Sequence, residues 1–166
     1  MENREQRLTM RILTIWRSLC QGTTLPRRAQ IDPLLFGADW ANCLLLDIDP
    51  KIDRSRLAFV GDNLRDPSWP PLDRQMMSEC EDGTLLQATL ASAARVIAKG
   101  VPISTAGLVP QEGESIVYRS ILLPLAESSG RIDGLLGGAS FRLIAVEEEV
   151  HPIEEPRAAR PQLVAG

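Results

Sequence analysis

The chain has 166 residues, of which 44% are apolar and 24% are charged, and a formal net charge of −4. This fits one globular domain with appendages, and no run of about 18 apolar residues exists to cross a bilayer. The first 28 residues carry a net charge of +4 and the remainder −8. The acidic body argues against broad nucleic-acid binding, while the basic N-terminal arm suits an acidic partner surface.

The N-terminus and the cysteines indicate a cytoplasmic protein. Residues 1–5 are too charged for a secretory signal and lack its apolar run. Cys20, Cys43 and Cys80 are odd in number and lack metal-site spacing. We therefore expect the reducing cytoplasm, with Cys43 acting as a small core residue on a strand.

Residues 6–20 have the pattern of an amphipathic helix. Their apolar residues recur at spacings of four, three and four, as in the a/d seam of a short coiled coil, and a tryptophan widens the seam: Leu8, Ile12, Ile15, Trp16 and Leu19. An isolated helix of this length is marginal in water, so the seam must pack on something. Three partners stay open, namely its own domain, the same helix of a second copy, and a membrane surface. We take the seam as the preferred protein-interaction surface and expect a homodimer.

The segment Leu25–Pro33 follows this helix. Asp32 and Pro33 have the chemistry of an N-cap and a first helical residue, which predicts a short helical turn. Arg27 and Arg28 precede the turn in an extended stretch. Either one of them pairs with a carboxylate of the body, or both are solvated.

A hairpin of two strands comes next. Residues 41–48 form a short apolar run that predicts a buried strand, and residues 55–60 predict its partner. Asp47 and Asp49 lie two residues apart, a spacing that puts both carboxylates on one strand face. They could act as an acid–base pair or bind a divalent cation, and the alternative is strand-end solubility and turn chemistry.

A long helix is predicted in the second half. The three prolines in residues 67–71 exclude a long helix there, and Trp69 is expected to be a packing plug. A short helix is expected over 72–80 and a long one over 84–99, ended by Gly100. The long helix has an apolar face made of Leu85, Leu86, Thr89, Leu90, Ala93, Val96 and Ile97.

Three more strands complete the domain. They are expected over 101–109, 114–125 and 131–144, and the last contains glycines that predict a bend or a close backbone approach: Gly134, Gly137 and Gly138. Short loops between neighbouring strands predict antiparallel pairing, with helices covering one face of the sheet. The acidic run Glu147–Glu149 reads as a solvated exit from the last strand, and disorder is expected from about residue 151.

The order of helix, two strands, helices and three strands resembles that of a PAS domain. The residues narrow this resemblance to a PAS-like family found largely in alphaproteobacteria, often as single-domain proteins. Four motifs carry it over about residues 15–145: Leu25–Pro33 with Arg27, Arg28, Asp32 and Pro33, then Leu44-Leu45-Leu46-Asp47, then Arg54–Gly61, then Leu122-Leu123-Pro124-Leu125 leading to Leu135-Leu136-Gly137-Gly138. The chain departs from the family at Gln30, where an acidic residue is usual, and over 62–69, which borders the usual ligand cavity.

The resemblance implies an α+β fold with a five-stranded antiparallel sheet, helices on one face and a preceding amphipathic helix. The expected divisions are residues 1–24 for this helix, 25–146 for the PAS-like domain and 147–166 for an acidic, proline-rich, disordered tail. The resemblance also implies a sensory or regulatory module, commonly dimeric, that acts through protein contacts and is not an enzyme.

Cofactor chemistry known from this fold is not expected here. His151 is the only histidine and lies in the predicted tail, which argues against haem held by a core histidine and leaves only a Cys or Met ligand open. A flavin photosensor of this fold needs a cysteine in a helical motif rich in Asn, Arg and Gln, and the residues around Cys80 do not match it. The sequence also lacks nucleophile-elbow, phosphate-loop and metalloprotease motifs, so we identify no cofactor, metal or catalytic site.

Three functions therefore compete. The leading one is a non-catalytic PAS-type regulatory protein in cytoplasmic signal transduction that acts through contacts with a signalling partner, with or without a small-molecule ligand of unknown identity. The second is a small enzyme with a cone-like cavity and Asp47 as base, which requires that carboxylate to lie in a pocket. The third is an interaction scaffold whose core is packed solid.

Overall fold

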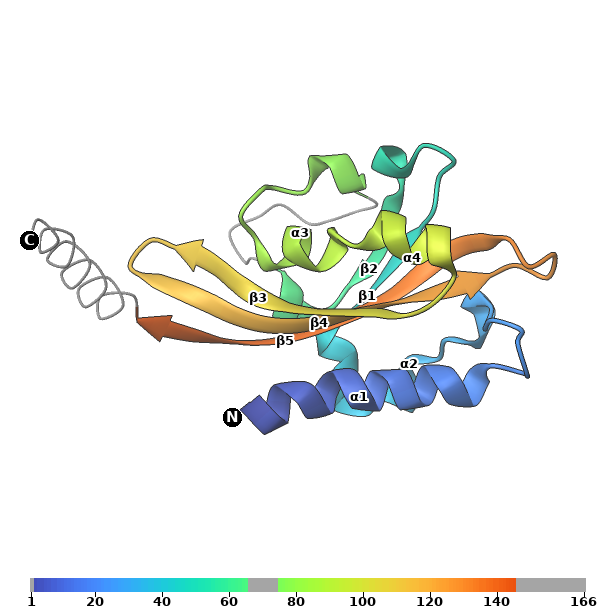
Figure 1. Ribbon diagram of the computed structural model, residues 1–166, viewed down its shortest axis with the longest axis horizontal. Helices are drawn as coiled ribbons and strands as arrows, with labels where there is room; N and C mark the ends of the chain where they lie inside the picture. The colour runs from blue at the N-terminus through green and yellow to red at the C-terminus, as the bar shows by residue number, and fades with distance from the viewer. Residues whose placement is uncertain (1, 66–74, 146–166) are drawn as a thin grey trace, which may run out of the picture.

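The computed structural model describes residues 2–65 and 75–145, with side chains from residue 7 onward. Its centre is an antiparallel sheet of five strands in the order β2-β1-β5-β4-β3 (Figure 1). The strands are β1 (Cys43–Asp47), β2 (Arg56–Val60), β3 (Ile103–Gln111), β4 (Glu114–Ala126) and β5 (Ile132–Ala145). The predicted α+β class and the five-stranded antiparallel sheet are confirmed.

Helices pack on both faces of this sheet (Figure 1). The α-helices of the described residues are α1 (Glu2–Leu19), α2 (Pro33–Phe36), α3 (Leu85–Leu90) and α4 (Ala93–Lys99). Short 3-10 helices connect them: η1 (Arg28–Gln30), η2 (Gly37–Asn42), η3 (Ile52–Arg54), η4 (Asp62–Leu64) and η5 (Met77–Glu79). Of the helix expected over 72–80, the described part contains only η5.

The sheet lies between two apolar clusters. Alternate residues of β1 point to opposite faces, so Leu44 and Leu46 join the cluster under α3 and α4 while Cys43 and Leu45 join the cluster under α1. The helices between β2 and β3 cover one face of the sheet, as expected, and α1 covers the other. The physical reason is that the sheet is apolar on both faces: the run 121–126 of β4 is buried throughout, and both faces need a cover.

The helix α1 packs on β4 and β5 of its own domain. Ile12 is fully buried and lies over Gly138, where an added Cβ would overlap the Ile12 Cδ1 atom. The Trp16 indole N–H donates a 3.0 Å hydrogen bond to the carbonyl oxygen of Pro124. The predicted close approach at the strand glycines is thus confirmed, with α1 as the approaching element.

This packing identifies one of the three partners left open for the helix, and the role of the seam as a surface for a second copy stays a prediction. The structure shows the domain's own sheet, against which Leu8, Ile12 and Trp16 are buried. Those three side chains are therefore covered within one copy of the chain. Of the predicted contact surface, only Ile15 and Leu19 are half-exposed.

The local start and stop signals are confirmed with one correction. The Asp32 carboxylate accepts a 3.0 Å hydrogen bond from the Leu34 N–H at the start of α2. Gly100 ends α4 with a φ of 67°, a value that favours glycine. The single helix predicted over 84–99 is instead two helices, because the buried Ser92, with φ −95° and ψ 7°, interrupts the helical turns. Both short helices thereby keep an apolar face on the curved sheet.

Several predictions concern segments outside the described residues. These are the packing role of Trp69, the irregular stretch 67–71, the solvated run Glu147–Glu149 and the disordered tail with His151. They stay predictions.

Candidate functional site

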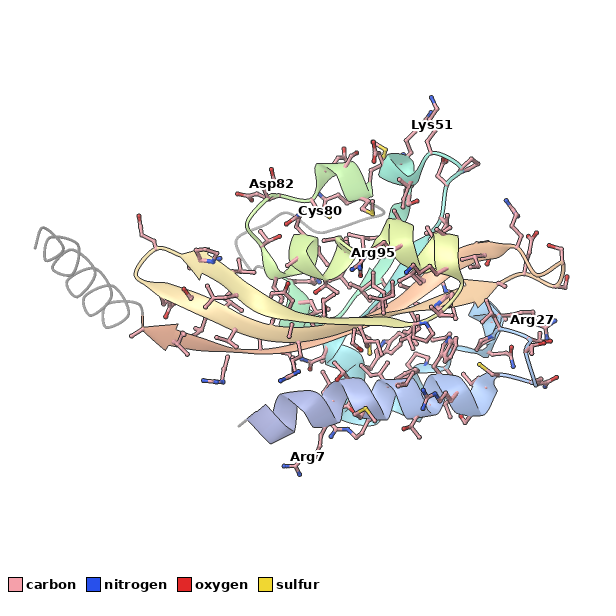
Figure 2. All side chains as sticks on the ribbon, viewed as in Figure 1. Arg7, Arg27, Lys51, Cys80, Asp82 and Arg95 are labelled. Carbon is pink, nitrogen blue, oxygen red and sulfur yellow. The ribbon has the colours of Figure 1, made fainter. Side chains whose placement is uncertain are left out.

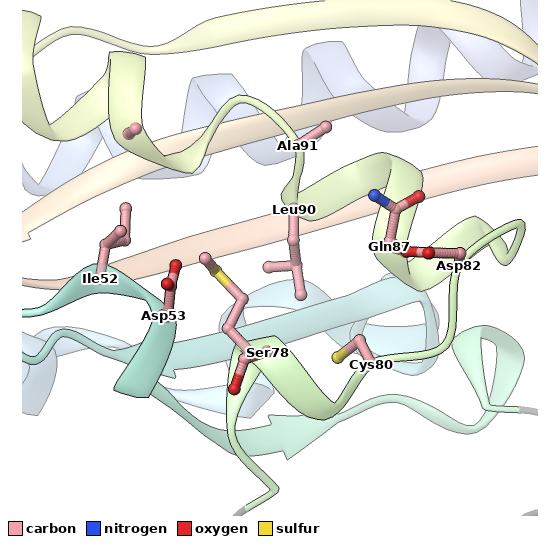
Figure 3. Close-up of a pocket in the computed structure, with 10 residues that line it drawn as sticks. Ile52, Asp53, Ser78, Cys80, Asp82, Gln87, Leu90 and Ala91 are labelled. Atoms are coloured by element: carbon pink, nitrogen blue, oxygen red, sulfur yellow. The ribbon is translucent and has the colours of Figure 1, made fainter.

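A groove with two adjoining hollows runs beside α3 and α4. The first hollow, of about 340 Å³, lies between η3, η5 and α3 (Figure 3) and is lined by Ile52, Asp53, Met77, Ser78, Cys80, Asp82, Gln87, Leu90, Ala91 and Ala94. The second, of about 370 Å³, is lined by Ile48, Asp49, Pro50, Ile52, Ala94, Ile97, Ala98, Arg131 and Ile132. Because both hollows share Ile52 and Ala94, we treat them as one groove.

Backbone pairing brings the walls of the groove together. The Met77 N–H donates to the Ser55 carbonyl at 2.7 Å, and the Leu57 N–H donates to the Gln75 carbonyl at 2.9 Å. The segment at 75–77 is thereby held along β2, which places η5 beside η3. On the opposite wall, the Thr84 hydroxyl oxygen accepts a hydrogen bond from the Gln87 N–H at 3.1 Å and starts α3.

The first hollow has acidic and amide groups at its mouth. Asp53 and Asp82 are exposed, whereas Gln87 is half-buried. Figure 3 shows Asp82 and Gln87 on one side of the hollow, with Asp53 across it and Leu90 between them. Figure 2 places Cys80 and Asp82 on the same side of the sheet as Lys51 and Arg95, away from α1. None of the residues that line this hollow is basic, so it favours a cationic or hydrogen-bond-donating group.

The Cys80 thiol lines the same hollow without being reactive. Burial, and to a lesser degree the nearby Glu79 carboxylate, raises the pKa of Cys80 to about 11. The thiolate is the nucleophilic form of cysteine. At neutral pH Cys80 is therefore protonated and offers the hollow a soft, apolar contact.

The second hollow is largely apolar. Its charged lining residues are Asp49 and Arg131, and the other lining residues are apolar: Ile48, Pro50, Ile52, Ala94, Ile97, Ala98 and Ile132. Both charged groups are already engaged: the Asp49 carboxylate accepts a 2.8 Å hydrogen bond from the Lys51 N–H, and Arg131 forms an ion pair with Glu127 at 3.1 Å. This hollow therefore suits an apolar group.

The space between these helices and the sheet is filled by side chains. The leucines of this cluster that lie at or below 1% exposure are Leu44, Leu46, Leu57, Leu86, Leu122 and Leu135. Protein interiors packed in this way leave little room for a ligand. The groove consequently lies at the margin of the helical layer, where the loops meet α3 and α4.

Asp47 lies away from the groove. It follows Leu45 on the α1 face of β1, and one of its carboxylate oxygens accepts a hydrogen bond from the Arg28 guanidinium in an ion pair. The prediction that one arginine of the pair binds a carboxylate of the body is thus confirmed for Arg28. Asp49 lies beyond the end of β1 in the groove, so the two aspartates do not form a joint site, and Asp47 does not meet the requirement for a pocket base.

The motif residues Arg27, Arg28, Asp32 and Pro33 have local structural contacts. The Arg27 N–H donates to the Gln30 side-chain carbonyl at 2.8 Å, and Asp32 with Pro33 starts α2. These elements lie on the α1 side of the sheet, opposite α3 and α4 (Figure 1). The segment therefore shapes the domain and does not line the groove.

Among residues 2–65 and 75–145, no cluster of three or more His, Cys, Asp or Glu side chains is arranged to hold a metal ion. Cys20, Cys43 and Cys80 are free thiols. In the same part of the chain, no helix is long and apolar enough to span a membrane.

The chain has similar solved structures, whereas no protein-family model and no curated protein matches it. The light-state structure of the blue-light photoreceptor Aureochrome1 LOV is 18% identical over 61% of this chain and 87% of that chain, with a TM-score of 0.42. A light-oxygen-voltage domain studied with a flavin analogue is 12% identical over 69% and 87%, with a TM-score of 0.45. The PAS domain of Bordetella pertussis BvgS is 17% identical over 65% and 77%, with a TM-score of 0.37.

The strand order, with α3 and α4 inserted between β2 and β3, assigns the fold. The chain has a PAS-like fold. This agrees with the arrangement that the sequence motifs predicted.

Of the groove residues, the sequence analysis identified only Asp49 as a candidate site residue. Ile52, Gln87 and Ala94 belong to three segments that carry no shared motif, and each is ordinary in its local pattern. Cys80 was considered only as a flavin-reactive residue. The groove is created by the pairing of the segment at 75–77 with β2, which no periodicity in the sequence signals.

Proposed function

We propose that this protein is a PAS-type sensory or regulatory module of cytoplasmic signal transduction, in which the groove beside α3 and α4 binds a small molecule. The observation that carries the proposal is the pair of adjoining hollows of about 340 and 370 Å³ on the α3 and α4 side of a PAS-like sheet. Volumes of this size suit small-molecule sites. The signal then passes to a protein partner by surface contacts.

The two hollows define the class of ligand. An elongated molecule would place an apolar body against Ile48, Ile97 and Ile132, and a cationic or donor-rich end beside Asp53 and Asp82. The mostly apolar second hollow contributes burial, and the polar groups of the first fix the orientation. Ala94 lies where the hollows join, so it controls whether one molecule can occupy both.

Native mass spectrometry of the protein purified from its own host without denaturation tests this proposal. Ala94 is exposed and sits at the junction, so Ala94→Phe should fill the groove without disturbing the core. We expect an added small-molecule mass on the wild type that is lost in Ala94→Phe. The matched control is Ala29→Phe, because Ala29 is also exposed but lies in η1 on the other side of the sheet.

The outcomes separate the alternatives. An added mass that survives Ala94→Phe would place the ligand elsewhere and refute the groove. An added mass equal to that of a flavin would identify the bound small molecule as a flavin. A wild type that carries no added mass favours the scaffold function instead, a second candidate supported by the solid packing of Leu44, Leu46 and Leu135 beneath α3 and α4.

A further inference from the structure

The two edge strands of the sheet, β2 and β3, differ in whether another segment pairs with them. At one edge, β2 is followed by the segment at 75–77, which pairs with it through the Arg56–Met76 bridge and two backbone hydrogen bonds. At the other edge, β3 pairs only with β4, and no described residue forms a backbone hydrogen bond along its outer side. Figure 1 shows β3 as the outermost strand on that side. An uncovered edge strand is a template for a further strand.

The hairpin geometry shows which backbone groups of β3 are free. A two-residue turn joins Gln111 to Glu114, so this pair exchanges both of its backbone hydrogen bonds. Hydrogen-bonded pairs alternate from there, which directs the N–H and C=O groups of Ser104, Ala106 and Leu108 outward. The backbone groups of Pro110 also point outward. Its missing N–H therefore removes no hydrogen bond between β3 and β4.

This edge has little protection against pairing. Natural edge strands are blunted by charged side chains, prolines, bulges or covering elements, and β3 carries only Pro110, near its end. The sequence of β3, Ile-Ser-Thr-Ala-Gly-Leu-Val-Pro-Gln, contains no charged residue over nine positions. Ser104, Ala106 and Leu108 are exposed on the α1 face, and Leu108 leaves about half of its side chain, 49%, in solvent.

We infer that β3 is a self-association surface, on which β3 of a second copy pairs antiparallel to form a continuous sheet across a two-fold axis. A second copy fits this edge because it offers a strand of equal length, with the same alternating donors and acceptors. Neither strand brings a charge, so no like charges meet at the two-fold axis. This surface replaces the α1 seam, whose Ile12 and Trp16 are buried in their own domain.

Charge-swap variants test the surface directly. Ala106 is exposed and central in β3, opposite Arg119 of β4, so Ala106→Lys places two positive charges near the two-fold axis. Ala106→Glu can instead pair with Arg119, which separates the effect on the dimer from any effect on the β4 pairing. By sedimentation velocity we expect a wild-type dimer, and monomers for Ala106→Lys and Ala106→Glu measured separately. An equimolar mixture of these two variants should recover the dimer, because opposite charges then face each other. The control, Ala29→Lys, should stay dimeric.

Amide hydrogen exchange gives a second readout at residue resolution. On dilution from dimer to monomer, the amides of Ser104, Ala106 and Leu108 should lose protection at least tenfold. The amides of Thr105 and Gly107 point toward β4 and should change little. This alternation is specific to strand pairing, because a general loss of structure would expose both sets.

Each of these measurements either supports or refutes the pairing of β3 with β3 of a second copy. A wild type that stays monomeric at millimolar concentration overturns it, as does an Ala106→Lys variant that remains dimeric or exchange protection without alternation. Loss of the dimer in Ala106→Lys with recovery in the mixture supports it. These readouts do not depend on any added small-molecule mass, so failure here and failure of the ligand groove are distinguishable.

Discussion

A double-mutant cycle between Ile12 and Gly138 tests whether α1 is an integral layer of this domain. A Cβ at position 138 would overlap the Ile12 Cδ1 atom, and Ile12 is fully buried with no free direction in which to move. Overpacking of this kind costs about 1–3 kcal/mol, so Gly138→Ala should destabilise the protein by about 1–2 kcal/mol. Ile12→Val removes only the Cδ1 methyl and should cost about 1 kcal/mol.

The double variant should be less damaged than the sum of the two. In Ile12→Val the atom that collides is gone, and the methyl group introduced by Gly138→Ala occupies part of the vacated space. The coupling energy should therefore be favourable by about 1–2 kcal/mol, within the range measured for contacting residues. Urea denaturation followed by far-UV circular dichroism measures all four proteins.

Gly137 provides the matched control. Its Cβ would point to the opposite face, where it meets Leu122 at 2.8 Å and Leu44 at 3.0 Å. Gly137→Ala should thus destabilise the domain but add independently to Ile12→Val. Additive free energies in the Ile12–Gly138 cycle would refute the placement of α1. So would coupling that changes with protein concentration, because α1 would then lie on another copy.

The remaining predictions concern a cap, an ion pair and two thiols. Thr84→Ala removes the hydroxyl that caps α3 and should lower the unfolding free energy by about 1 kcal/mol; an unchanged urea midpoint would contradict it. Arg28→Met breaks an ion pair whose side chains are both more than a third exposed, so the loss should stay below about 1 kcal/mol, and a larger loss would show that the arginine has a packing role. Burial raises the pKa of Cys43 to about 12 and of Cys80 to about 11, from ordinary values near 9.0. Both thiols stay protonated in the fold while the unfolded chain ionises, so stability should be constant below about pH 9 and fall as the pH rises from there toward 11. The fall measured by urea titration should be smaller in Cys80→Ala, and an equal fall would contradict the assignment.

Local chemistry in the sequence predicted most of the secondary structure. Asp32 before Pro33 starts a helix because its carboxylate accepts a hydrogen bond from a free N–H group of the first turn. Gly100 ends a helix because glycine tolerates a positive φ. The five strands lay where short apolar or alternating runs predicted them. The break at Ser92 was not predicted, because the apolar pattern of residues 84–99 continues without interruption through it.

The seam of α1 shows the limit of pattern analysis. Spacings of four, three and four predict that Leu8, Ile12, Ile15 and Leu19, with Trp16 beside them, need an apolar partner. They do not state which partner, because a sheet and a second helix are equally apolar. The distance from Ile12 to Gly138 in the sequence is too long for any local rule to connect them.

The sequence by itself determined the elements, their caps and their order, and with the order the class of fold, since each depends on residues within a few positions of one another. Only the tertiary structure determined which face of the sheet α1 covers, where a groove remains beside α3 and α4, and which sheet edge the described residues leave unpaired. Each depends on segments such as 75–77 and β2, whose contact is made by backbone groups common to all residues. A side-chain pattern does not encode such a contact, so only the folded chain reveals the groove and the edge of β3 that no described residue pairs with.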